Sequence, residues 1–223
     1  YLDMGYNRER IGVLVWAGDD LDNAYYMPWA NAIYLGDGGE RFFPLSREES
    51  IIYHEYAHAV VDKIQPLRGT EGSAMNEGQA DYFACSFSNE PRVGEYVVSK
   101  KNRPYLRILE HALHYPEDLQ HEPHDDGRIW AGTLWDIRKQ LGADVTDRLI
   151  LRSFFLLKEE PGYLDAILAL LEADRQLNAG EHLTVIRDCF QARGYPLDAP
   201  NLFSARELKH LIRFPSLQQE DRP

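Results

Sequence analysis

Cysteine is scarce in this sequence. Only Cys85 and Cys189 occur among the 223 residues, which is too few for a small fold that depends on disulfide bonds. Both lie in apolar patterns typical of helices. Two interpretations stay open, because a free cysteine is commonly a buried thiol and the two could also form one bridge. Neither interpretation indicates the compartment.

Long apolar runs and an excess of positive charge are also absent. No stretch approaches the ~20 apolar residues that span a bilayer, so we expect no membrane partner. No charged-then-apolar leader is present, an absence that decides nothing about secretion. The 36 Asp and Glu outnumber the 24 Lys and Arg, and the formal net charge is -12. We expect no nucleic-acid partner, because a phosphate backbone needs a basic surface.

The remaining composition, with 44% hydrophobic and 27% charged residues, is ordinary for a globular protein. The first 45 residues predict strands and turns, with β-prone runs at 11–16 and 31–35. Residues 95–127 predict a long loop of the kind that is usually functional. The chain from residue 127 onward is mainly helical in pattern. Helices are predicted at 129–141, 144–157, 164–177 and 183–193.

Two helices are predicted between these parts. The sequence Ser-Arg-Glu-Glu at 46–49 has the spacing of a capping box and opens a helix that runs through Val61. Pro66 lies just past its end, where a helix should stop. A second helix is predicted over about 74–87. The sequence therefore predicts an α+β fold.

The first of these helices carries a pair of histidines, because residues 54–58 read His-Glu-Tyr-Ala-His. Side chains four apart on a helix share one face, roughly 6 Å apart, so His54 and His58 can bind one zinc ion. Glu55 can reach a water molecule at that metal without binding the metal itself. The alternative is a solvated pair, but the flanking apolar residues predict a buried helix, where histidines need partners.

The second helix offers a third ligand. A catalytic zinc site needs three protein ligands and one open position. Glu77 and Asp81 are four residues apart, so both can face the first helix. Glu77 is predicted to bind the metal, and Asp81 to accept a hydrogen bond that fixes the tautomer of a ligand histidine. A solvated acidic face is the alternative interpretation.

These two motifs together resemble the gluzincin zinc metallopeptidases of the thermolysin and fungalysin group. The glutamate lies in the run Asn-Glu-Gly-Gln-Ala-Asp at 76–81, which is closest to the fungalysins. The similarity covers about residues 31–195 and is strongest over 31–85. It implies a thermolysin-like α+β fold, with a short β-containing lobe and the zinc-binding helix at 1–62 and a mostly helical lobe at 63–223.

The resemblance implies a secreted zinc peptidase, in the first place a metalloendopeptidase, that cleaves peptide or protein substrates. Glu55 would be the general base on a metal-activated water, and Asn76 would join Asp81 in orienting the ligands. His124 would stabilise the oxyanion of the transition state, with His114 and His121 as rivals. Nothing in the sequence indicates the oligomeric state.

The resemblance also implies substrate contacts. Asn31 and Ala32 are similar to the edge strand that pairs with an extended peptide. Arg107 is similar to an arginine that holds a substrate carbonyl, a role suited to its fork of donors. Ile51 would line a pocket for a hydrophobic side chain just after the cut.

Some features depart from the group. No tyrosine lies between His58 and Glu77, where thermolysin-like enzymes place one near the oxyanion, so Arg68 or His124 would substitute. Calcium at the aspartates near residue 20 is possible but not supported, since a solvated turn fits better. The missing tyrosine and the short β lobe, with only 53 residues before His54, favour an alternative, a catalytically weak or inactive metallopeptidase-like binding protein. The intact Glu55 argues against it. A structural zinc domain fits less well, because such sites are usually cysteine-rich.

Overall fold

The computed structural model describes residues 10–197. The strands are β1 (Gly12–Val15), β2 (Ala24–Met27), β3 (Ala32–Leu35), β4 (Arg92–Val93) and β5 (Arg107–Ile108). The helices are α1 (Glu49–Ile64), α2 (Gly69–Ser88), α3 (Glu95–Val98), α4 (Pro123–Leu141), α5 (Ala143–Phe154), α6 (Tyr163–Asn178) and α7 (Leu183–Ala192). The fold is α+β, as predicted, and none of the described helices is long and apolar enough to cross a membrane.

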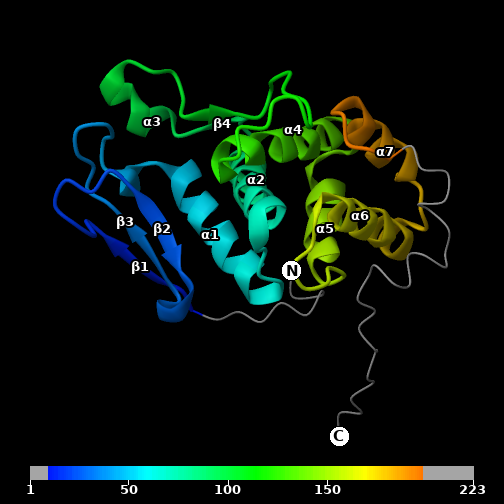
Figure 1. Ribbon diagram of the computed structural model, residues 1–223. Coiled ribbons are helices and arrows are strands. Elements are labelled where there is room, and N and C mark those ends of the chain that lie inside the picture. The colour runs from blue at the N-terminus through cyan, green and yellow to red at the C-terminus, as the bar shows by residue number, and fades with distance from the viewer. Residues whose placement is uncertain (1–9, 198–223) are drawn as a thin grey trace, which may run out of the picture.

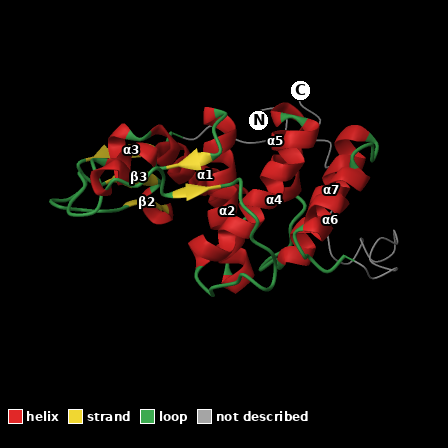
Figure 2. Ribbon diagram, turned by 90° about the horizontal axis from the view of Figure 1, so that it is seen from above, coloured by secondary structure: helices red, strands yellow, loops and turns green. Residues whose placement is uncertain are grey.

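The main sheet and the C-terminal helices lie at opposite ends of the molecule. Figures 1 and 2 show β1–β3 at one end, α5, α6 and α7 at the other, and α1 and α2 between them. One cluster of buried side chains joins these parts, running from Ile33 and Leu35 in β3 to Phe190 in α7. The central helices therefore have apolar neighbours on both sides, which keeps their polar side chains in fixed positions.

The order of strands in the main sheet is β1-β3-β2. The central strand β3 pairs in parallel with β1 and antiparallel with β2. The prediction of an edge strand at Asn31 and Ala32 is therefore wrong, because Ala32 pairs with Gly12 on one side and Met27 on the other. Both sides of β3 are occupied, so a peptide cannot be added there. The edge strand nearer to α1 is β2.

Helix α1 begins without the predicted capping box. Leu45–Arg47 form a 3-10 turn, and Glu48 is the N-cap residue, with no side-chain cap. The Glu48 carboxylate instead accepts hydrogen bonds from the Ser50 hydroxyl at 2.8 Å and the Tyr96 backbone N–H at 2.7 Å. Tertiary contacts with the segment around α3 therefore replace the local cap.

Helices α2 and α4 cross at two glycines. A Cβ atom on Gly78 would lie 2.4 Å from the Gly127 carbonyl oxygen, and one on Gly127 would lie 2.7 Å from that of Ala74. No larger residue fits at this crossing without moving a helix. The crossing lies beside Glu77 and the first turn of α4, so it sets how close those two elements come.

Two further expectations are settled by the tertiary structure. The predicted loop at 95–127 contains α3 and β5, and α4 already begins at Pro123. Cys85 and Cys189 are both buried free thiols, and burial raises the pKa of each. The interpretation of two buried thiols is therefore confirmed, and the two cysteines do not form a bridge in this structure.

Candidate metal centre

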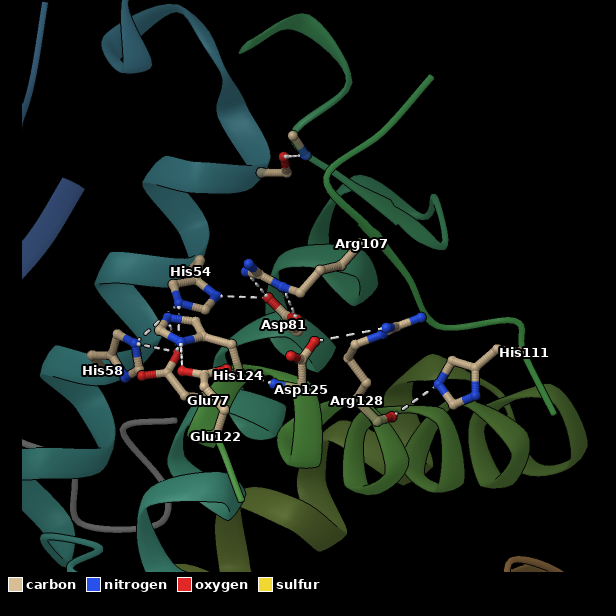
Figure 3. A network of polar contacts seen from close by, with 12 residues as sticks. His54, His58, Glu77, Asp81, Arg107, His111, Glu122, His124, Asp125 and Arg128 are labelled. Carbon is tan, nitrogen blue, oxygen red and sulfur yellow. Dashed lines mark hydrogen bonds and ion pairs between the residues drawn. The ribbon is translucent and has the colours of Figure 1, made fainter. Parts of the chain in front are cut away.

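The two histidines of α1 are oriented by side chains of α2. His54 Nδ1 lies 2.8 Å from Asp81 Oδ1, and His58 Nδ1 lies 3.2 Å from Asn76 Oδ1. Both contacts use the same ring nitrogen, so both Nε2 atoms are left facing the carboxylate of Glu77 (Figure 3). Hydrogen bonding at one ring nitrogen fixes the tautomer that leaves the other free for a metal.

Three atoms converge on one point. The two Nε2 atoms are 3.0 Å apart, and Glu77 Oε2 lies 3.2 Å from that of His54 and 3.5 Å from that of His58. Ligands of a tetrahedral zinc ion at 2.0–2.2 Å are roughly 3.3–3.6 Å from one another. These three residues can therefore hold a metal ion.

The Glu77 oxygen supports this fit independently. Oε2 is buried and has no hydrogen-bond partner among the described residues. A buried carboxylate oxygen without a partner is costly unless a cation or another donor satisfies it. The chemistry of the set, two imidazole nitrogens and one carboxylate oxygen, is that of a catalytic zinc site with an open position.

The charges around the centre depend on one another. Burial alone would lower the pKa of His54, but its contacts with Asp81 and Glu77 outweigh burial and raise the pKa to about 10. Burial would raise the pKa of Glu77, but His54 and His58 hold it well below its usual range. Without a cation, a proton on His54 balances the carboxylates, so protons and a metal compete for this site.

Arg107 supports the centre from behind. Its guanidinium donates to both oxygens of Asp81, at 2.6 and 2.7 Å, and both groups are largely buried. The pKa of Asp81, which burial would raise, is lowered by this charge and by His54. Figure 3 shows Asp81 between Arg107 and His54. The resemblance suggested that Arg107 contacts the substrate. No pattern in the sequence predicted its hydrogen bonds to Asp81.

His124 approaches the same point from α4. It lies in the first turn of that helix, after the N-cap residue Glu122, and not in a loop. Its Nε2 atom is 3.4 Å from Glu77 Oε2, and its Nδ1 atom is 2.9 Å from Glu122 Oε1. Its rival His114 contacts the Ala112 carbonyl instead. Among the described histidines between 111 and 124, His124 is the one that lines the pocket.

A pocket of about 330 Å³ opens beside the centre. It is lined from β2 and its flanks by Asn23, Ala24, Tyr25, Tyr26 and Pro28, and from the helices by His54, Glu55, His58, Asp62, Asn76, Glu77 and His124. The sequence did not predict that residues of β2 line this pocket. In the N-terminal part of the chain the dipeptide Asn-Ala occurs at 23–24 and again at 31–32, and only the folded structure shows that the copy at 23–24 lines the pocket.

Other predicted residues lie elsewhere. Ile51 is 5% exposed and packs in the core, not along the pocket. Arg68 is the exposed N-cap residue of α2 and does not line the pocket either. The Asp22 carboxylate accepts backbone hydrogen bonds from Gly39, Arg41 and Phe42. Its oxygens therefore already have partners, and the one group of three potential ligands within residues 10–197 is at the centre described above.

Comparison with known proteins agrees with the motif resemblance. Residues 43–145 match the family described as fungalysin metallopeptidase (M36). The chain is 25% identical to extracellular metalloproteinase 2 of Phaeosphaeria nodorum, over 82% of this chain and 36% of that protein. It is 26% identical to extracellular metalloproteinase 4 of Trichophyton rubrum, over 68% and 30%, and 22% identical to extracellular metalloproteinase 2 of Arthroderma gypseum, over 66% and 30%. The chain thus spans about a third of the length of these relatives.

Proposed function

This chain is a relative of the fungalysin metallopeptidases, and from that premise we propose that it hydrolyses peptide bonds with one zinc ion held by His54, His58 and Glu77. The observation that carries the proposal is the convergence of three ligand atoms within 3.5 Å of one another, one of them a buried Glu77 oxygen with no hydrogen-bond partner among the described residues. When bound, zinc supplies Lewis-acid activation of water and polarisation of the scissile carbonyl.

Glu55 is proposed as the general base. It is 5% exposed, follows the first ligand histidine on α1, and lines the pocket. A carboxylate there can take a proton from the attacking water and later pass it to the leaving amine. The missing tyrosine between His58 and Glu77 speaks for a binding protein without turnover, but such a protein has no use for the Glu55 carboxylate.

His124 is proposed to stabilise the oxyanion. Its half-exposed ring faces the pocket, and Glu122 fixes the orientation of its other nitrogen. A donor aimed at a developing negative charge typically contributes about 10²–10³ in rate. His124→Ala should therefore lower kcat far more than it changes KM, and an unchanged kcat would remove His124 from the mechanism.

The peptide is proposed to lie along β2. Asn23 O accepts from Gly36 N, so in an antiparallel ladder Tyr25 and Met27 bond to β3 and the intervening residues do not. The backbone N–H and C=O of Ala24 therefore face away from β3 and can pair with an extended substrate. The relatives are named extracellular, and we propose the same location for this chain.

The test combines metal analysis with hydrolysis. Purified wild-type protein should contain about one zinc per chain and cleave an unstructured protein such as casein. Glu55→Gln should keep the zinc and lose about 10²–10⁴-fold in rate. Glu49→Gln, a change in the exposed first turn of the same helix, is the matched control. Equal rates in wild type and Glu55→Gln would end the proposal.

A further inference from the structure

The pocket beside the candidate metal centre is acidic. Its carboxylates are Glu55, Asp62 and Glu77, and neither Lys nor Arg is among the described residues that line it. The proposed function employs Glu55 and Glu77. It leaves Asp62 without a role.

Asp62 is placed by the same helical repeat as the histidines. His54, His58 and Asp62 are spaced by four residues on α1, so their side chains form one stripe facing the pocket. Asp62 is partly buried. Its carboxylate makes no hydrogen bond or ion pair with any residue between 10 and 197.

The position of Asp62 is unfavourable for the helix itself. Helix α1 ends at Ile64, so Asp62 lies in its last turn. The unpaired carbonyl groups there carry partial negative charge, which disfavours a carboxylate. A carboxylate that works against the helix dipole, has no partner and faces a pocket is suited to a cationic ligand.

A substrate on β2 would pass this carboxylate. Strand β2 packs against α1 and runs alongside it (Figure 1). Tyr56 is midway between the two histidines in the sequence, and Asp62 follows it by six residues. At 1.5 Å per residue, this separation is about 9 Å along the helix. An extended peptide advances about 3.3 Å per residue. Asp62 therefore lies beside a substrate residue about two or three positions from the cut.

We propose that Asp62 is a specificity-determining residue that selects substrates with a positive charge two or three residues from the scissile bond. The charge is a Lys or Arg side chain or a free α-amino group, which share the same chemistry. The inference rests on the proposed peptidase function, since it describes the substrate of that site.

The experiment compares matched peptides. In a set of peptides, a single Lys is placed in turn at each position within three residues of the cut. Each Lys peptide is compared with a peptide that has Met at the same position. Every peptide is made with a free and with an acetylated N-terminus. Wild-type kcat/KM should favour one Lys position, or the free terminus, by about three- to fivefold, as for a partly exposed ion pair. Asp62→Asn should bring that ratio to one, and Asp62→Lys should reverse it. Glu49→Gln should keep it.

Binding provides a second readout that needs no turnover. In the Glu55→Gln background, the dissociation constants of the Lys and Met peptides should differ by the same factor, and adding Asp62→Asn should remove the difference. A Lys-to-Met ratio of one in the wild-type background overturns the role of Asp62, even if cleavage is rapid. Absence of cleavage with the binding preference intact overturns the peptidase function and leaves cation selection standing.

Discussion

Asp81 connects the proposed ligand His54 to Arg107. Its two oxygens accept from the guanidinium, and one of them also contacts His54 Nδ1. Asp81→Asn keeps the shape but removes the charge that holds both partners. We expect metal affinity to fall about 10- to 100-fold, as is usual when the group behind a ligand histidine is changed. Titration against a competing chelator measures this.

The matched control is a partly buried carboxylate on α5. Asp147 accepts hydrogen bonds from the Tyr82 and Ser86 hydroxyls, away from the centre. Asp147→Asn should destabilise the fold without changing metal affinity. An equal loss of affinity in both variants would mean that Asp81 acts through general stability and not through His54.

At the scale of single elements, strand β2 makes the clearest prediction. The Ala24 backbone N–H faces away from β3, so Ala24→Pro removes it without breaking the ladder. Loss of one main-chain hydrogen bond of about 1 kcal/mol should lower kcat/KM roughly fivefold. The zinc content and the thermal midpoint should stay unchanged. Unchanged kinetics would show that the substrate does not pair with this edge.

The crossing of α2 and α4 makes another prediction. In Gly127→Ala, the new methyl group would lie 2.7 Å from the Ala74 oxygen and 3.0 Å from Glu77 Cβ. The helices must separate, which we expect to cost about 1–3 kcal/mol of unfolding free energy and to weaken metal binding. Urea unfolding and zinc titration measure the two effects.

Gly72→Ala serves as the control for the crossing, because the nearest atom to its new methyl group is 3.3 Å away. This smaller contact should have a much smaller effect on both measurements. If Gly127→Ala bound zinc with normal affinity while being strongly destabilised, the crossing would not position Glu77.

At the scale of the whole molecule, metal should couple to stability. The proposed ligands join α1 to α2, so a cation that binds only the folded chain stabilises it by mass action. At a metal concentration about 1,000 times Kd this is about 4 kcal/mol. A chelator should then lower the thermal midpoint by roughly 10 °C. Glu77→Gln, which removes one proposed ligand, should show little chelator-dependent change; an equal change would contradict the site.

Stability should also depend on pH through His111. This ring accepts from Leu113 N and Arg193 and contacts the Arg128 carbonyl. Burial, with the Arg193 charge, lowers the pKa of His111 to about 4. Between pH 4 and about 6.5 the unfolded chain binds the extra proton, so unfolding free energy decreases as pH falls through this window.

His111→Gln keeps a donor and an acceptor but cannot be protonated. The slope of unfolding free energy against pH between 4 and 6.5 should therefore be smaller in the variant, while the two slopes agree above pH 7. Denaturant unfolding at several pH values measures this. Identical slopes across the whole range would show that His111 is not protonated on unfolding.

The residues of the candidate centre could be predicted from the sequence alone. His54, His58, Glu77 and Asp81 could be grouped because each pair is four residues apart on a helix, and helical geometry puts such pairs on one face whatever surrounds them. The α+β class followed in the same way from local patterns, as did the C-terminal helices, which end within a few residues of their predicted limits.

Which side chains meet across elements depends on the tertiary structure. Whether the Asn-Ala pair at 23–24 or at 31–32 faces the pocket depends on strand pairing between distant segments. Arg107 donates to Asp81, which lies 26 positions earlier in the sequence, and the Tyr96 backbone N–H donates to Glu48, which lies 48 positions earlier. Such contacts depend on how the helices and sheet pack, and packing is a property of the whole chain that no local pattern contains.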